Sequence, residues 1–93
     1  MQFEWDGEKV ESNLKKHGVG FAEAKTIFEN PLARIFEDED HSFAERRDGI
    51  VGYSDKNRLL IISFTERGDD TIRIISARET TPNERRKYEN ANG

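Results

Sequence analysis

The segment Arg58-Leu-Leu-Ile-Ile-Ser-Phe-Thr65 contains the strongest apolar run of the chain, and Ile72-Arg-Ile-Ile-Ser-Ala77 follows it after the turn residues Gly68-Asp-Asp70. Short runs of apolar and β-branched residues bounded by turn residues are typical of buried β-strands. The link between the two runs is too short for a crossover, so the strands are expected to pair antiparallel. The two runs therefore predict the centre of a β-sheet, with the first run covered on both faces.

Three further strands are predicted around this centre. Residues 48–53 connect to the first run through the turn-rich residues 54–57, which extends the sheet as an antiparallel meander. Residues 33–36 are a short strand candidate. Residues 2–5 alternate polar and apolar side chains, as expected of a short edge strand.

The first predicted helix begins after Asp6, a preferred N-cap residue, and ends at Gly18, which tolerates the left-handed conformation of a C-cap. Val10, Leu14 and His17 fall on one side of this helix and are expected to face the core. His17 has a second reading as a catalytic group, but a packed or C-capping histidine fits its position better.

Two more helices complete the order. In the second helix, Phe21 and Phe28 share a face, and Asn30-Pro31 stops the helix. The C-terminal helix begins at Thr81-Pro-Asn-Glu84, a capping box with proline at the first helical position. Tyr88 is its large apolar anchor, so this helix is expected to depend on tertiary contacts.

The order of elements, β-α-α-β-β-β-β-α, predicts an α+β fold. Residues 1–93 are expected to form a single domain, with two N-terminal helices and one C-terminal helix against an antiparallel sheet. Trp5 and Phe21 are expected in the core. Residues 90–93 are expected to be a disordered tail.

The composition excludes several classes of protein. The chain has a net charge of −4 and no cysteine, so disulfides and thiolate metal sites are excluded. No apolar run approaches the ~20 residues of a membrane span, and no signal-peptide pattern is present, so a cytoplasmic protein without membrane contact is expected. Because the histidines, His17 and His41, lack the spacing of a metal site, neither a metal nor another cofactor is expected.

Basic side chains are concentrated near the C-terminus of this acidic chain. Residues 71–88 contain five basic and two acidic side chains, a local net charge of +3. On a regular strand, Arg73 and Arg78 would lie on opposite faces, so only one would reach a given ligand unless a bulge intervenes. The arginines gathered around the predicted sheet are Arg46, Arg47, Arg67, Arg73, Arg78, Arg85 and Arg86.

The planar, permanently charged arginine side chain suits phosphate and the extra charge of a pentacoordinate transition state. With Glu45, Glu66 or His41 to move protons, the sequence contains the parts of a metal-independent ribonuclease. Such an enzyme needs a base at the ribose 2′-hydroxyl, an acid at the leaving oxygen and cations around phosphorus. The same residues also fit a non-catalytic module that binds RNA or protein, and composition does not separate the two hypotheses.

Several motifs occur in order along nearly the whole chain: Phe3-Glu-Trp-Asp6, Asn13-Leu-Lys-Lys-His-Gly-Val19, Thr65-Glu-Arg67, Arg73-Ile-Ile-Ser-Ala-Arg78 and Glu84-Arg85. Through these motifs the chain resembles BrnT-type toxins. The resemblance implies the toxin of a type II toxin–antitoxin pair, with a RelE-like fold and a ribonuclease activity that inhibits translation. It also implies a BrnA-like antitoxin with a ribbon-helix-helix domain. The antitoxin is expected to form a heterotetramer with the toxin, and promoter DNA is expected to be bound through the antitoxin only.

We expect the residues that act on RNA to fall into two groups. Catalytic roles are expected for Arg78, Arg67, Glu45, His41 and Arg47, and RNA binding for Arg73, Arg85, Arg86 and Lys87. Arg78 is the main candidate for stabilising the phosphorane, because it leaves the predicted sheet at the end of a strand. Arg46 departs from the family pattern, which has a second glutamate beside Glu45. Proton transfer then falls to Glu45 or to a residue elsewhere.

Overall fold

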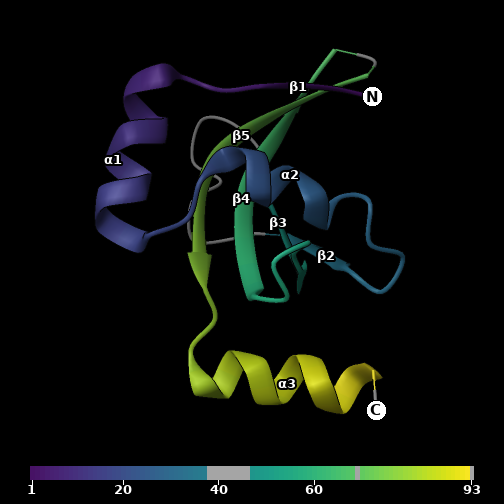
Figure 1. Ribbon diagram of the computed structural model, residues 1–93. Coiled ribbons are helices and arrows are strands. Elements are labelled where there is room, and N and C mark those ends of the chain that lie inside the picture. The colour runs from purple at the N-terminus through teal and green to yellow at the C-terminus, as the bar shows by residue number, and fades with distance from the viewer. Residues whose placement is uncertain (38–46, 69, 93) are drawn as a thin grey trace.

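The structure, a computed structural model, describes residues 1–37, 47–68 and 70–92, and within them the predicted order of elements is confirmed. The elements are β1 (Gln2–Glu4), α1 (Gly7–His17), α2 (Phe21–Ile27), β2 (Arg34–Glu37), β3 (Asp48–Tyr53), β4 (Leu59–Arg67), β5 (Thr71–Glu79) and α3 (Pro82–Asn92). In Figure 1, α2 lies in front of the sheet, α1 beside β5, and α3 below the sheet. The α+β prediction, with two N-terminal helices and one C-terminal helix, is confirmed.

The strands form one sheet in the order β1-β5-β4-β3-β2. Strands β3, β4 and β5 make the predicted antiparallel meander, in which Ile50, Ile62 and Ala77 lie side by side. The short strand β2 extends it by pairing antiparallel with β3. β1 is at the predicted edge position but runs parallel to β5. The antiparallel sheet is thus extended by one parallel strand. Because α1 and α2 follow β1, no hairpin turn fixes its direction.

The hydrophobic core lies between α2 and one face of the sheet (Figure 1). The α2 side contributes Val19, Phe21, Ala24 and Ile27, and the sheet contributes Ile50, Leu60, Ile62, Phe64, Ile72, Ile74 and Ala77. Burial of one large apolar side chain contributes roughly 1.5–3 kcal/mol, so this layer is the main source of stability. The prediction that Phe21 is a core residue is confirmed.

Two residues expected in the core are instead at the surface. Leu14 is 53% exposed and Trp5 is 37% exposed, although the Trp5 ring packs edge-on against Phe21 with centroids 6.0 Å apart. The buried residue of α1 is Asn13, next to Leu14 in the chain. The apolar stripe proposed for α1 was therefore wrong at Leu14, because this helix lies beside β5 and turns Asn13 toward the strand.

Asn13 replaces a neighbouring strand along part of β5. β1 pairs with β5 over residues 71–73 and ends before Ala77. The Asn13 amide nitrogen donates to the Ala77 carbonyl at 2.8 Å and to the Val19 carbonyl at 2.9 Å, and its oxygen accepts from the Ala77 amide at 3.0 Å. Buried backbone groups require hydrogen-bond partners, and here one side chain supplies them.

The helix α3 has the predicted capping box and is longer than expected. The Thr81 amide donates to Glu84 Oε1 at 2.8 Å, and the Glu84 amide donates to Thr81 Oγ1 at 3.2 Å. The Tyr88 hydroxyl donates to the Leu32 carbonyl at 2.9 Å, and Arg34 Nη2 donates to the Ala91 carbonyl at 3.0 Å. These contacts hold the last turn against the sheet, so the expected disordered tail is helical through Asn92.

Candidate functional site

A β-bulge on β5 decides which of its side chains lie on the side of the sheet opposite the core. Ser63 of β4 lies opposite Ser76, but the next residue, Phe64, lies opposite Ile74, so Ile75 is the extra residue of the bulge. Ile74 and Ala77 consequently both face the core. The same shift brings Arg73 and Arg78 to the other face together. The two arginines would lie on opposite faces of a regular strand, and the bulge is the exception that the sequence left open.

We call the sheet face opposite the core the arginine face. It is formed by residues that alternate with the core positions of β3, β4 and β5: Gly49, Val51, Ile61, Ser63, Thr65, Arg73, Ser76 and Arg78. Because Arg73 and Arg78 are five residues apart on a strand, they are separated by roughly 15 Å. A single phosphate cannot contact both, whereas a strand of RNA can.

At the β1 end of the arginine face, Glu4 lies beside two arginines. Its Oε1 atom is 3.5 Å from Arg73 Nη1 and 3.6 Å from Arg67 Nη1. This oxygen is buried and accepts no hydrogen bond within the described part of the chain. Arg67 and Arg73 are thus gathered around one carboxylate by loose ion pairs. Glu4 was not among the residues predicted from the sequence, because its contacts depend on the parallel pairing of β1 with β5.

At the α3 end, Arg78 is held by Glu84. Arg78 Nη1 and Nη2 donate to the two Glu84 carboxylate oxygens at 2.8 and 2.9 Å, and Nη1 also donates to the Glu79 carbonyl at 3.1 Å. The hydrogen bonds from Arg78 are the main cause that lowers the pKa of Glu84 to about 2. Arg78 therefore occupies a fixed position where β5 meets α3.

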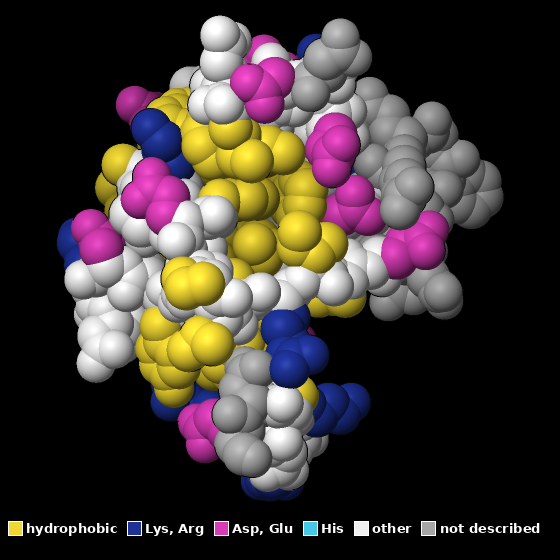
Figure 2. Space-filling view, turned by 90° about the vertical axis from the view of Figure 1, so that its right-hand side faces the viewer, with side chains coloured by type: hydrophobic (Ala, Val, Ile, Leu, Met, Phe, Trp, Pro, Cys, Tyr) yellow, Lys and Arg dark blue, Asp and Glu magenta, His cyan; other side chains and the backbone are white. Residues whose placement is uncertain are grey.

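The basic residues of α3 do not all face the sheet. One side of α3 faces the sheet and carries Glu84, Arg85 and Tyr88. Arg85 Nη1 lies 3.5 Å from the Tyr53 hydroxyl, and the Tyr88 ring packs edge-on against the Tyr53 ring. Arg86 and Lys87 are exposed, and Arg86 donates to Asn83. Figure 2 shows a hollow between α3, at the bottom, and the rest of the molecule, with Lys and Arg side chains along its lower wall.

The middle of the arginine face has small and aromatic side chains. Ser63 and Ser76 provide hydroxyl groups, and the Phe36 ring of the neighbouring β2 lies over Gly49. A Cβ atom at Gly49 would be 2.3 Å from Phe36 Cζ, so the ring needs a glycine beneath it. Phe36 lies at the β2 edge of this surface, three strands from the arginines of β5, and an exposed aromatic ring is a group on which nucleic-acid bases stack.

The remaining predicted catalytic residues lie in or next to the link between β2 and β3. Arg47 is half-buried and precedes β3 by one residue. Its spacing of two residues from Gly49 places it on the side of the arginine face. His41 and Glu45 lie outside the described residues. Within the described ranges, no three His, Cys, Asp or Glu side chains are grouped as metal ligands, and no helix is long and apolar enough to cross a membrane.

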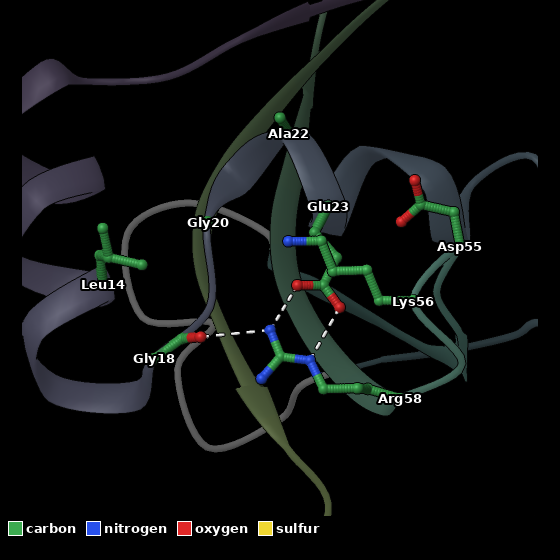
Figure 3. A pocket seen from close by; sticks show the side chains of 8 residues that line it. All are labelled: Leu14, Gly18, Gly20, Ala22, Glu23, Asp55, Lys56 and Arg58. Atoms are coloured by element: carbon green, nitrogen blue, oxygen red, sulfur yellow. Dashed lines mark hydrogen bonds and ion pairs between the residues drawn. The ribbon is translucent and has the colours of Figure 1, made fainter.

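A separate pocket of about 300 Å³ lies on the other side of the molecule, between α2 and the turn from β3 to β4 (Figure 3). Buried Glu23 accepts hydrogen bonds from Arg58 and from the Ser54 hydroxyl, and Arg58 also donates to the Gly18 carbonyl at 3.1 Å. The hydrogen bond from Arg58 is the largest cause that lowers the pKa of Glu23. Because both charged groups are engaged with each other, we interpret this pair as a structural link.

Comparison with known proteins gives a consistent result. The family described as "ribonuclease toxin, BrnT, of type II toxin-antitoxin system" matches residues 5–84. The crystal structure of the Brucella abortus ribonuclease toxin BrnT is similar in fold, with a TM-score of 0.69 and 23% sequence identity. This similarity covers 87% of the present chain and 97% of the Brucella chain. A comparison with curated protein sequences found no match.

Proposed function

Since the chain belongs to the BrnT family of ribonuclease toxins of type II toxin–antitoxin systems, we propose that it cleaves RNA on the arginine face without a metal ion and thereby inhibits translation. The observation that supports this site is the bulge at Ile75, which directs Arg73 and Arg78 to the same face. The two arginines provide permanent positive charge along a path long enough for several nucleotides.

In the proposed reaction, the ribose 2′-oxygen attacks phosphorus while its proton passes to a base. The bond from phosphorus to the 5′-oxygen breaks, and an acid donates a proton to that oxygen. The products are a 2′,3′-cyclic phosphate and a 5′-hydroxyl end. Arg78 stabilises the charge that develops on the phosphorane, because preorganised cations act most strongly where charge appears in the transition state. Arg67 and Arg47, which were also expected to be catalytic, lie toward the Arg73 end of the arginine face, so we assign them to a neighbouring phosphate of the same strand.

We assign proton transfer to His41 and Glu45, which belong to the link that follows β2 and precedes β3. We assign RNA binding to Arg73 beside Glu4 and to Arg85, Arg86 and Lys87 on α3. The exposure of the α3 side chains supports this division, since exposed cations attract a polyanion without the fixed geometry that catalysis needs.

The family implies an antitoxin partner for this protein. We propose that this partner has a ribbon-helix-helix domain, that its dimer carries two toxin molecules as a heterotetramer, and that promoter DNA is bound by the antitoxin. The net charge of +3 over residues 71–88 favours an acidic or amphipathic antitoxin segment that covers α3 and the arginine face. Sedimentation of the toxin co-expressed with its antitoxin tests this, and finding only free toxin would contradict it.

The activity is tested with purified protein and labelled RNA and DNA oligonucleotides of the same sequence, in the presence of EDTA. We expect cleavage of RNA alone, with 2′,3′-cyclic phosphate or 3′-phosphate ends, and a rate that falls with salt as phosphate contacts are screened. Loss of all cleavage on chelation would contradict the metal-independent mechanism. RNA binding without cleavage by a folded protein would favour the alternative of a non-catalytic binding module.

A further inference from the structure

A second pocket, which has a basic lining, lies beside the arginine face, between α1 and β5. Its volume is about 210 Å³, and the polar side chains that line it include Lys9, Ser12, Lys16, His17 and Ser76. The described residues that line it include no carboxylate. Two lysines, an imidazole and two hydroxyl groups form the set of donors that binds a phosphate or phosphodiester.

The charges of α1 are divided between two sides of the helix. Lys9, Ser12 and Lys16 are spaced by three, four and seven residues, which places them on one side, and they line the pocket. By the same periodicity, Glu8, Glu11 and Lys15 are centred roughly 100° further round the helix axis, away from the pocket. Neither Lys9 nor Lys16 forms an ion pair with a described residue. Their charge is therefore not cancelled by the acids of their own helix.

The pocket exists because of two features of β5. β1 ends at Glu4, so the edge of β5 beyond Arg73 is open to α1, and Asn13 ties α1 to this edge at Ala77. The bulge then places Ile75 and Ser76 in the pocket wall. Ser76 also lies on the arginine face, opposite Ser63. The pocket and the arginine face are thus joined through Ser76.

We propose that this pocket binds the phosphodiester backbone of single-stranded RNA where the strand leaves the arginine face. The inference rests on the proposed ribonuclease function and extends it. Lys9 and Lys16 are two helical turns apart, about 10 Å along the axis, so they can contact two phosphates of one strand. The RNA would pass from Arg78 or Arg73 across Ser76 and along the pocket side of α1.

An acidic antitoxin segment would meet the same charges, but two observations favour RNA. The first observation is that hydroxyl groups lie among the cations of the pocket. Those hydroxyls suit the unesterified oxygens of a phosphodiester. Ile75 is the one apolar side chain among the described lining residues, whereas protein interfaces are centred on apolar anchors.

The test compares Lys16→Gln with Lys15→Gln. Both lysines are exposed, in the last turn of α1, and adjacent in sequence, so the substitutions change net charge and the helix terminus equally. The probe is a labelled single-stranded RNA with 2′-O-methyl riboses, which cannot be cut through the 2′-oxygen. Binding is therefore measured whether or not the protein is a ribonuclease, and cleavage of unmodified RNA is measured separately.

We expect Lys16→Gln to raise the Kd about fivefold and to reduce the slope of log affinity against log salt by about 0.7, the value for one phosphate contact on a single strand. Lys9→Gln/Lys16→Gln should reduce that slope by about twice as much. Lys15→Gln should match the parent. Equal RNA affinity of Lys16→Gln and Lys15→Gln overturns the proposal. Equal RNA affinity with weaker antitoxin binding in Lys16→Gln would instead assign the pocket to the antitoxin.

Discussion

Arg78 and Glu84 form a bidentate ion pair that joins the C-terminal end of β5 to the first turn of α3. Glu84 is at the same time the capping-box residue of that helix, since its Oε1 accepts from the Thr81 amide. Arg78, the side chain proposed to stabilise the phosphorane, is thus held in place by a residue that also caps the N-terminus of α3. The position of α3 and the position of the proposed catalytic charge are coupled through one carboxylate.

We predict that Glu84→Gln lowers stability in a pH-dependent way. The pKa of Glu84 is lowered from 4.5 to about 2, so the ion pair contributes stability above about pH 4.5, and this contribution is lost as pH falls toward 2. Because the glutamine amide oxygen can still accept the capping-box hydrogen bond, the substitution removes the ion pair and leaves the helix cap in place. The variant should lose roughly 1 kcal/mol at neutral pH, because both side chains keep partial contact with water. Urea unfolding between pH 2 and 7 measures this, and a constant difference across that range would contradict it.

A second prediction concerns the catalytic role of Arg78. Removal of a preorganised charge donor costs about 3 kcal/mol of transition-state stabilisation, so Arg78→Ala should reduce the cleavage rate by a hundredfold or more. Lys87→Ala removes an exposed cation of α3 and should remain toxic, with weaker RNA binding and a smaller salt dependence. Cleavage rate, RNA affinity and thermal midpoint are measured for both variants.

Glu84→Gln is the control for this comparison, because it breaks the same ion pair but keeps the arginine. If Arg78 acts on RNA, Glu84→Gln should retain activity to within about tenfold, a loss of at most 1.4 kcal/mol. Equal losses in Arg78→Ala and Glu84→Gln would mean that Arg78 serves only to dock α3. Parental cleavage by Arg78→Ala would exclude the catalytic assignment altogether.

The sequence predicted the elements well because their ends have local chemical signals. Asp6 accepts a hydrogen bond from the Glu8 amide, Gly18 adopts the left-handed conformation with φ of 69°, and Thr81 caps α3 as expected. Such signals act over a few residues and need no knowledge of the rest of the fold. Both limits of α1, the start of α3 and the meander could therefore be predicted from the sequence, whereas α2 ends at Ile27, before the predicted stop at Asn30-Pro31, and α3 continues to Asn92.

The arrangement of the site could not be predicted in the same way. Glu4 meets Arg73 because β1 joins β5 from the other end of the chain, and a pattern of local residues does not specify that pairing. The bulge did leave a signal. A regular strand would have placed Ser76 and Arg78 in the core beside Ile72 and Ile74, and polar residues at core positions indicate an irregular strand.

A third prediction tests the link between Glu23 and Arg58. Arg58→Ala leaves a buried carboxylate without its cation, so we expect a loss of about 3 kcal/mol at neutral pH. Arg58 lowers the pKa of Glu23, so the parent gains this stability above the ordinary carboxyl pKa, and the difference should narrow as pH falls. Lys56→Ala, at an exposed position of the same pocket, should stay near the parent in denaturant unfolding. If Arg58→Ala lowers the free energy of unfolding by no more than Lys56→Ala does, the Glu23–Arg58 pair contributes little to stability.

A last prediction compares the effects of an added methyl group at Gly49 and at Gly52, two glycines of β3. A Cβ at Gly52 would lie 2.9 Å from Ala33 Cβ and 3.3 Å from Cγ2 of the fully buried Ile27, and the Ala33 backbone cannot easily move. Gly52→Ala should therefore cost roughly 1–3 kcal/mol through overpacking. At Gly49 the three atoms nearest to the added methyl group all belong to the ring of Phe36, which is 42% exposed and can rotate into solvent. Gly49→Ala should consequently be the milder change in stability, yet it should weaken RNA binding, because it removes Phe36 from the arginine face. Unfolding and RNA titration of both variants check this, and a Gly49→Ala protein that is the less stable of the two would show that Phe36 is fixed in place.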